Sequence, residues 1–171
     1  MPEKNIVLIG FMGTGKSSVG RALSREMGIP VLDSDRLIEE MEGMTINEIF
    51  ARKGQPYFRD AETRVLRNLA DRTDRYILSC GGGMPLREEN RPLMRALGTV
   101  ILLDSSVPVL TRRLSRATDR PNLRGEGSLE SRIGALLSER MPMYLDAADF
   151  IVKNERKSIG QLTAEIRNRL N

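Results

Sequence analysis

A run of residues near the start of the chain has the types and the spacing that suit the binding of nucleotide phosphates. The segment from Gly10 to Ser17 fits the pattern G-x-x-x-x-G-K-[ST]. Its glycines let the backbone fold tightly around an anion, because no side chain intervenes. The positive charge of Lys16 suits the β- and γ-phosphates, and the hydroxyl of Ser17 is a ligand for Mg²⁺. The run therefore predicts a phosphate-binding loop.

The segments on either side of this loop fit the same interpretation. Ile6–Ile9 is a short apolar run typical of a buried strand, and Ser18–Met27 has the pattern of a helix. Between such elements, backbone N–H groups and the positive end of the helix point toward phosphate oxygens. A glycine-rich turn without a ligand is the alternative, and these flanks disfavour it. The residues expected to bind the nucleotide here are Gly13, Thr14, Gly15, Lys16, Ser17 and Ser18.

Two more polar or glycine-rich clusters follow apolar runs. Asp33–Asp35 comes after the run Pro30–Leu32, and the glycines Gly81–Gly83 come after Tyr76–Cys80. Taken alone, the first cluster could be a helix cap and the second a turn. Ligands of open parallel sheets bind at the carboxyl ends of the strands. The three clusters together therefore predict a single cleft.

Asp33 and Asp35 are the candidate groups for metal and proton chemistry. Two residues apart at the end of a strand, their side chains are expected to point in different directions. Asp33 would face Mg²⁺ through water, and Asp35 would face an acceptor hydroxyl. The chain contains no histidine, which leaves a carboxylate as the natural proton acceptor.

Two arginine-containing segments have both an ordinary and a functional interpretation. Arg59 could bind a carboxylate through both arms of its guanidinium, held by Glu62 one helical turn later. From these residues alone, an exposed ion pair of little consequence is favoured. The polar stretch Asp119–Gly127 predicts a loop between helices, either a surface loop or a lid that brings Arg120 to the transferred phosphoryl group.

Composition excludes several classes of protein. The chain has 171 residues, 40% hydrophobic and 29% charged, which suits one globular domain. The net charge of +4 is scattered and aromatic residues make up only 4%, so nucleic acid is not an expected partner. Without histidine, and with Cys80 as the only cysteine, no Ser-His-Asp triad and no intrachain disulfide can form. Cys80 is expected to be buried. No apolar run approaches membrane-spanning length, so we expect a cytoplasmic protein.

Short apolar runs alternate with longer amphipathic stretches along the chain. This alternation predicts an α/β fold, with a parallel sheet covered by helices on both faces. The expected strands are Ile6–Ile9, Pro30–Leu32, Tyr76–Cys80, Val100–Leu103 and Phe150–Val152. The expected helices are Lys16–Met27, Arg36–Met41, Ile46–Lys53, Tyr57–Asp71, Glu88–Leu97, Val107–Ser115, Leu129–Tyr144 and Ile159–Leu170. Thr45 and Ser158 are expected to be N-caps, and Pro142 to kink or end its helix.

Taken together, these motifs resemble the shikimate kinase family over nearly the whole chain. The resemblance is carried by Gly10–Ser17, Asp33–Asp35, Phe58-Arg59-x-x-Glu62, Gly81–Gly83, Arg120-Pro121 and Arg140-x-x-x-Tyr144. It implies one domain over residues 1–171, a three-layer αβα fold with a five-stranded parallel sheet, as in P-loop NTPases of the nucleoside monophosphate kinase type. It also implies a mobile lid around residues 113–127 and an acceptor-binding region around residues 34–62.

The resemblance further implies a reaction and a set of site residues. The γ-phosphoryl group of MgATP would pass to the 3-hydroxyl of shikimate, in the biosynthesis of chorismate and the aromatic amino acids, in a monomeric enzyme. The implied catalytic residues are Lys16, Asp35 and Arg120, and the shikimate-binding residues are Asp35, Arg59, Gly81, Gly82 and Arg140. Arg113 would stack on adenine, Arg120 would reach the phosphates, and Arg156 would line the adenine pocket. Ser17 would bind Mg²⁺ directly and Asp33 through water.

Two positions depart from the family pattern. Gln55 stands where an acidic residue is expected, and Asn122 where the lid usually carries leucine.

Three other functions are alternatives to this one. A gluconate kinase would carry histidine and tryptophan in its motifs, and this chain has neither. A nucleoside monophosphate kinase would need a second base-binding pocket. A nucleotide-dependent switch protein would have no use for the acceptor-site arginines and Asp35.

Overall fold

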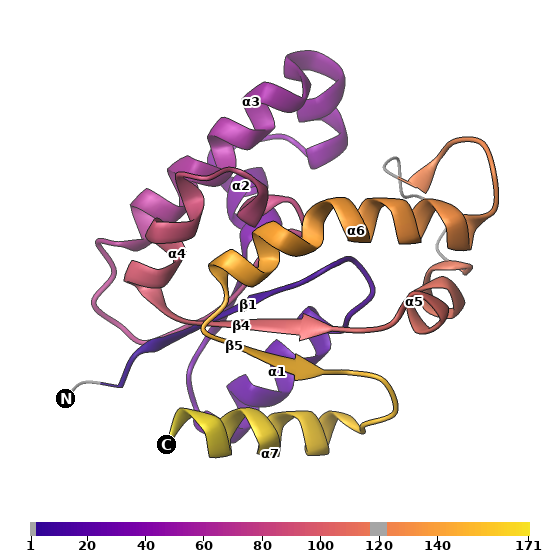
Figure 1. Ribbon diagram of the computed structural model, residues 1–171. Helices are drawn as coiled ribbons and strands as arrows, with labels where there is room; N and C mark the ends of the chain where they lie inside the picture. The colour runs from indigo at the N-terminus through magenta and orange to yellow at the C-terminus, as the bar shows by residue number, and fades with distance from the viewer. Residues whose placement is uncertain (1–2, 117–122) are drawn as a thin grey trace.

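A sheet of five parallel strands runs through the centre of the molecule. The structure is a computed structural model that describes residues 3–116 and 123–171. The strands lie in the order β2-β3-β1-β4-β5 (Figure 1). Their bounds are β1 (Asn5–Ile9), β2 (Val31–Asp33), β3 (Ile77–Ser79), β4 (Gly98–Asp104) and β5 (Phe150–Lys153). The prediction of a five-stranded parallel sheet is confirmed.

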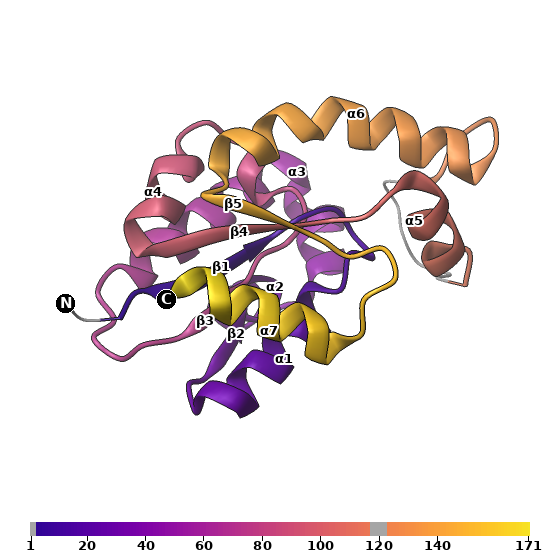
Figure 2. The ribbon, with the colours of Figure 1, turned by 60° about the horizontal axis from the view of Figure 1, so that its bottom comes forward.

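Helices cover both faces of this sheet and give it three layers (Figures 1 and 2). The α-helices are α1 (Lys16–Met27), α2 (Ser34–Glu42), α3 (Ile46–Leu69), α4 (Asn90–Leu97), α5 (Val107–Leu114), α6 (Leu129–Ala147) and α7 (Ile159–Leu170), and a 3₁₀ turn spans Met84–Leu86. α1 and α7 cover one face, while α3, α4 and α6 cover the other. None of these described helices is long and apolar enough to cross a membrane.

The alternation of side chains along β1 explains how one strand serves both layers. Ile6 and Leu8 pack into the core beneath α1 and α7, whereas Val7 and Ile9 pack into the opposite core. All four are fully buried. A strand buried on both faces appears in the sequence as a continuous apolar run, which is why it could be recognised there.

Two helices begin at the predicted N-caps. The hydroxyl of Thr45 accepts a hydrogen bond from the N–H of Glu48, and the side chain of Glu48 accepts one from the N–H of Thr45. Ser158 and Gln161 repeat this reciprocal arrangement at the start of α7. Each pair satisfies two N–H groups that the helix itself leaves without partners.

One helix is broken where the sequence predicts a gap, and another runs further than expected. The expected helices Ile46–Lys53 and Tyr57–Asp71 are the two parts of α3, separated at Gly54, whose φ of 82° and ψ of 172° are not helical. α6 does not end at Pro142 but continues to Ala147. Proline removes one hydrogen bond from a helix, and the burial of Tyr144 and Ala147 in the following turn offsets this loss.

Candidate active site

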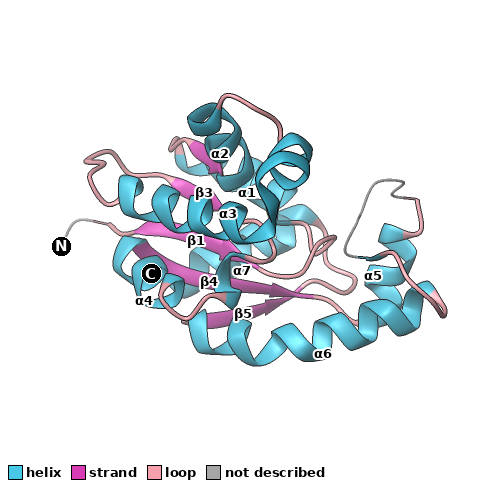
Figure 3. Cartoon of the chain, turned by 90° about the horizontal axis from the view of Figure 1, so that it is seen from above, coloured by secondary structure: helices cyan, strands magenta, loops and turns pink. Residues whose placement is uncertain are grey.

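The three clusters meet at the carboxyl ends of the strands. A cleft of about 270 Å³ is lined by the phosphate-binding loop, Asp33, Asp35, the end of β3, Gly81 and Gly82. β2, β3 and β1 are neighbours in the sheet, so the loops that follow them emerge side by side (Figure 3). The predicted convergence of these motifs on one cleft is confirmed, and the strand order is its cause.

The loop between β1 and α1 depends on glycine. Gly13 and Gly15 have φ values of 83° and 95°, in the left-handed region that other residues avoid. Lys16 begins α1 and its Nζ donates to the carbonyl oxygens of Gly10 and Phe11, at 2.8 and 2.9 Å. The side chain of Lys16 therefore lies across the loop, close to the place where a phosphate is expected to bind. Ser17 and Ser18 follow it and also line the cleft.

Neighbouring elements hold the carbonyl groups of the loop. Asn154 Nδ2, just beyond β5, donates to the carbonyl of Thr14 at 2.7 Å, and Arg113 Nη1 donates to the carbonyl of Gly13 at 2.9 Å. Thr14 itself is buried, and both its N–H and its hydroxyl donate to the carbonyl of Phe11. The side chain of Thr14 therefore shapes the loop and does not line the cleft.

Asp33 caps a helix, and this changes the reason why the two carboxylates differ. Its Oδ1 accepts from the N–H groups of Asp35 and Arg36, at 2.9 and 3.3 Å, as the N-cap of α2. The predicted reason is wrong, because residues two apart on an extended strand share one face. Asp35 instead lies in the first turn of that helix, and the helix sets its direction. The N-cap bonds use Oδ1 of Asp33, so Oδ2 is the oxygen that could face a hydrated cation.

The carboxyl group of Asp35 sits in surroundings that disfavour its charge. Burial, the neighbouring Asp33 and Glu39 raise its pKa to about 6, against the opposing effect of Lys16 and Arg59. A Cβ on Gly81 would lie 2.9 Å from Asp35 Oδ1, so only glycine leaves this oxygen its place. A pKa near neutrality suits a group that must take up a proton in the working pH range.

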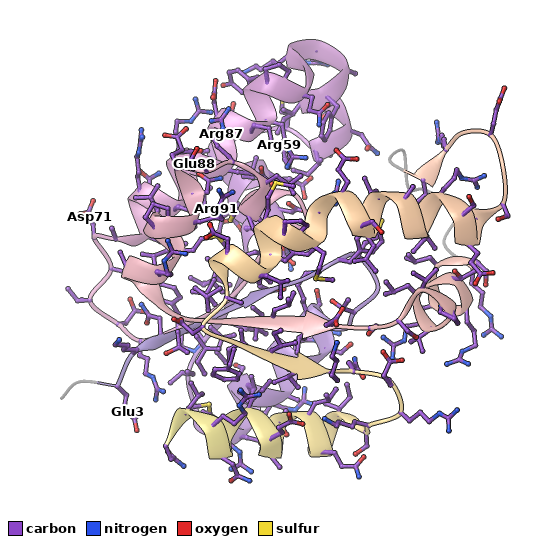
Figure 4. All side chains as sticks on the ribbon, viewed as in Figure 1. Glu3, Arg59, Asp71, Arg87, Glu88 and Arg91 are labelled. Atoms are coloured by element: carbon purple, nitrogen blue, oxygen red, sulfur yellow. The ribbon has the colours of Figure 1, made fainter. Side chains whose placement is uncertain are left out.

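Arg59 and Glu62 form a buried ion pair and not the exposed one favoured from sequence. Arg59 Nη1 lies 2.7 Å from Glu62 Oε2, and their side chains are 15% and 1% exposed. The surface interpretation is therefore wrong. Burial raises the pKa of Glu62 to about 7, while Arg59 opposes the rise. The guanidinium of Arg59 (Figure 4) occupies the space where a side chain on Gly83 would lie.

Arg140 approaches the same glycine segment from α6. It is 5% exposed, its guanidinium lies 5.8 Å from the centroid of the Phe11 ring, and its Nη1 would be 3.5 Å from a Cβ on Gly82. Four residues further along α6, the hydroxyl of Tyr144 donates to the carbonyl of Gly82 at 2.7 Å. Successive glycines thus lie against Asp35, Arg140 and Arg59.

Two buried side-chain atoms lack hydrogen-bond partners among the residues that the structure describes. They are Asp35 Oδ1, an acceptor, and Arg140 Nε, a donor. A buried polar atom without a partner costs about 1–3 kcal/mol, so such atoms are uncommon unless something else satisfies them. Asp35 Oδ1 lies beside Gly81, and the guanidinium of Arg140 lies beside Gly82. This arrangement fits a small ligand that carries both hydroxyl and anionic groups.

A larger hollow of about 610 Å³ elsewhere on the surface is lined by charged side chains that already have partners. It is lined by Arg87, Arg91, Arg95, Asp146 and their neighbours. Figure 4 labels Arg87 and Arg91 among them. Arg87 is paired with Asp60 at 2.7 Å, and Arg91 with Asp146 at 2.5 Å. Because these charges already satisfy one another, size alone does not make this hollow the site.

The remaining predicted residues are placed less fully. Arg113 lies against the phosphate-binding loop, while Arg156 is exposed in the segment after β5. Arg120 lies outside the described residues, as do Pro121 and Asn122. Sequence reasoning missed Asn154, although a polar residue directly after a strand at this edge of the sheet was a usable signal.

The donor set suits magnesium better than a cation that needs a full protein cage. Within residues 3–116 and 123–171, no group of three or more acidic, cysteine or histidine side chains could hold a metal. Ser17 and Asp33 offer one hydroxyl and one carboxylate in the same cleft. Mg²⁺ keeps several waters and takes further oxygens from substrate phosphates, so two protein oxygens are enough.

Comparison with known proteins identifies the family to which the chain belongs. A family model described as shikimate kinase matches residues 12–171. The chain belongs to the shikimate kinase family. It is therefore an ATP-dependent kinase. The shikimate kinase of Geobacter metallireducens is 46% identical over 163 residues, covering 95% of this chain and 89% of that protein.

Solved structures of shikimate kinases agree with the fold. The enzyme from Acinetobacter baumannii, in complex with shikimate, is 34% identical with a TM-score of 0.90, covering 99% of this chain and 93% of that one. The enzyme from Aquifex aeolicus is 36% identical with a TM-score of 0.79, covering 97% and 95%. A gluconokinase from Sinorhizobium meliloti, 19% identical with a TM-score of 0.57 over 98% and 91%, shares the fold.

Proposed function

We propose that this kinase transfers the γ-phosphoryl group of MgATP to the 3-hydroxyl of shikimate, giving shikimate 3-phosphate and ADP in aromatic amino-acid biosynthesis. The observation that carries the proposal is the pair of buried, partnerless atoms, Asp35 Oδ1 and Arg140 Nε. A hydroxy acid supplies a hydroxyl donor for the first and a carboxylate acceptor for the second. The related Acinetobacter baumannii enzyme binds shikimate in its crystal structure.

The acceptor-side residues divide the recognition of such an acid between charge and shape. Arg59 and Arg140 bind its carboxylate, because both guanidinium groups lie against the glycine segment. Asp35 accepts hydrogen bonds from its hydroxyls. Gly81 and Gly82 let the ring approach the backbone, since no side chain intervenes.

The nucleotide-side residues hold MgATP at the other end of the cleft. The loop residues Gly13, Thr14, Gly15, Lys16, Ser17 and Ser18 surround the phosphates, and Arg120 joins them from the lid. Arg113 stacks on adenine, and Arg156 lines the adenine pocket. Ser17 would hold Mg²⁺ directly and Asp33 would hold it through a water, and the cation would supply the charge that neutralises the phosphate oxygens.

The chemical step is a displacement at phosphorus. The 3-hydroxyl oxygen bonds the γ-phosphorus as the bond to the bridging oxygen of ADP breaks, and Asp35 accepts the hydroxyl proton. Lys16 and Arg120 stabilise the charge that spreads over the transferred group. Since positioning outweighs proton abstraction in such reactions, Asp35 contributes by orienting the hydroxyl as well.

Several broader expectations belong to the same proposal. We propose one domain over residues 1–171, with a lid around 113–127 and an acceptor-binding region around 34–62. We also propose a cytoplasmic monomer that binds neither nucleic acid nor membranes. Light scattering on the protein as it elutes from a size-exclusion column tests the monomeric state directly.

The substrate is tested by following ADP release from MgATP with a panel of acceptors. Shikimate, shikimate methyl ester, gluconate and the nucleoside monophosphates are offered separately, and each product is identified by mass. We expect turnover with shikimate and strongly weakened turnover with the ester, because the ester has no charge for the two arginines. Turnover with gluconate or a nucleotide would overturn the acceptor, and ATP binding without any transfer would overturn the reaction.

A further inference from the structure

The two acceptor-side groups that come from α2 and α3 depend on how these helices are held together. Asp35 lies in the first turn of α2, and Arg59 lies in α3 just beyond its break. Figure 3 places the two helices next to each other. A change in the direction of the second part of α3 would move Arg59 relative to Asp35. The contacts that set this direction therefore matter for the proposed acceptor.

The backbone at the break does not set that direction by itself. Gly54 has φ 82° and ψ 172°, a conformation open almost only to glycine. Glycine permits the turn but also permits many others, because it lacks a Cβ. Pro56 then fixes only its own φ. Side-chain contacts across the break must supply the rest.

Glu42, the last residue of α2, makes those contacts. Its Oε2 accepts from the Tyr57 hydroxyl at 2.7 Å and from Lys53 Nζ at 3.3 Å, and its Oε1 accepts from Arg64 Nη2 at 2.5 Å. Lys53 precedes Gly54, whereas Tyr57 and Arg64 follow it. One carboxylate therefore bonds to both parts of α3. We call these four residues, Glu42, Lys53, Tyr57 and Arg64, the Glu42 cluster.

The Glu42 cluster has the burial and the charge that a stable contact needs. The side chain of Glu42 is 8% exposed. The hydrogen bond from Tyr57 is the largest cause of a lowered pKa of Glu42, with Lys53 and Arg64 adding to it, so the carboxylate stays ionised. Lys53 Nζ and the guanidinium carbon of Arg64 lie 4.3 and 5.1 Å from the centroid of the Tyr57 ring. Both cations thus also contact the ring.

We infer that Glu42 and Tyr57 are positioning residues, which fix the direction of α3 after Gly54 and so place Arg59 against the carboxylate of the acceptor. Tyr57 stands two residues before Arg59 on the same segment. Neither Glu42 nor Tyr57 is among the residues that line the cleft. The inference rests on the proposed function for the identity of the acceptor acid.

The test compares Tyr57→Phe and Glu42→Ala with Glu89→Gln as a matched control. Glu89, at the start of α4, also pairs with an arginine of α3, Arg67 at 3.3 Å, but Arg67 lies far along α3 from the break. We expect Glu42→Ala to raise the KM for shikimate about tenfold, because small misplacements of binding groups are costly, while the KM for MgATP stays unchanged. Tyr57→Phe should show the same selectivity with a smaller rise, and Glu89→Gln should leave both KM values unchanged.

A double-mutant cycle separates positioning from general weakening of the fold. If the cluster acts through Arg59, Glu42→Ala should add nothing further to the KM for shikimate in an Arg59→Ala background. Additive effects, an equal rise in the KM for MgATP, or unchanged KM values would each overturn the inference. Tyr57→Phe removes one oxygen only, so it decides the matter if Glu42→Ala does not fold.

Failure of the inference is distinguishable from failure of the proposed function. If the wild-type enzyme does not phosphorylate shikimate, the proposed substrate is wrong, and the same variants are then measured with the acceptor that it does phosphorylate. If the wild-type enzyme phosphorylates shikimate and both variants keep its KM, only the inference fails.

Discussion

The two halves of the cleft achieve binding by different physical means. On the nucleotide side, a glycine-rich backbone loop is held through its carbonyl groups by Arg113 and Asn154. On the acceptor side, three charged side chains lie against glycines, which have no side chain to exclude them. Backbone N–H groups can recognise a phosphate that every nucleotide carries, whereas a particular acid must be recognised by placed charges. The buried polar atoms without partners and the carboxyl groups with raised pKa values therefore lie on the acceptor side.

The largest expected effect breaks the acceptor side while it leaves the nucleotide side intact. Asp35→Asn keeps the shape of the side chain but can neither accept a proton from the hydroxyl nor carry a charge. We expect kcat with shikimate to fall about 10²–10⁴-fold, the usual contribution of a general base. Calorimetric titration with MgADP should give the wild-type Kd. A kcat close to that of the wild-type enzyme would remove Asp35 from the chemical step.

The converse substitution should weaken the nucleotide side alone. Asn154→Asp is isosteric, but a carboxylate cannot donate to the carbonyl of Thr14 and repels it at the observed distance of 2.7 Å. We expect the KM for MgATP to rise about 5–150-fold, the equivalent of the 1–3 kcal/mol that a buried polar group costs when it is left without its partner. The KM for shikimate should stay as in the wild-type enzyme. Equal changes in both KM values would mean that the two sides are not independent.

The smallest expected effect is a pH-dependent gain in stability. The pKa of Asp35 rises from 3.8 to about 6 on folding, so the folded state binds this proton more tightly and becomes less stable as pH increases across that range. Asp35→Asn should therefore unfold at higher temperature than the wild-type protein above pH 6, and at the same temperature near pH 3, below the unfolded-state pKa of 3.8. The gain should be on the order of 1–2 kcal/mol, below the full value of the shift because some contact with water remains. Melting curves at the two pH values test this, and a gain at pH 3 of equal size would assign it to another cause.

The fold and the position of the cleft could be predicted because their signals are local in the sequence. The loop from Gly10 to Ser17, the glycines after β3 and the N-caps Thr45 and Ser158 each depend on neighbouring residues only. Apolar runs such as β1 indicate burial on both faces of a sheet. Strand order then brings the loops together.

Other properties of the site depend on residues that are distant in the chain, and the sequence does not display them. Glu62 looks like half of an exposed helical pair, and only the packing of α3 against the glycine segment buries it. Asn154 reaches Thr14 across 140 positions of sequence. The break at Gly54 was visible, but the Glu42 cluster that spans it was not, because Glu42 sits on a different helix. α6 continues three residues past its expected end at Tyr144, since buried neighbours outweigh the hydrogen bond lost at Pro142.

The buried thiol at the end of β3 has a practical consequence for fluorescence labelling. Cys80 is the only cysteine of the chain, it is 2% exposed, and burial raises its pKa well above the usual range of a thiol. Reagents that attack thiolates should therefore leave the native protein unmodified. A cysteine introduced at an exposed position, such as Glu126→Cys between α5 and α6, would then be the only cysteine that reacts with a fluorophore. The wild-type sequence is already a single-site labelling background, with no cysteine that must first be removed.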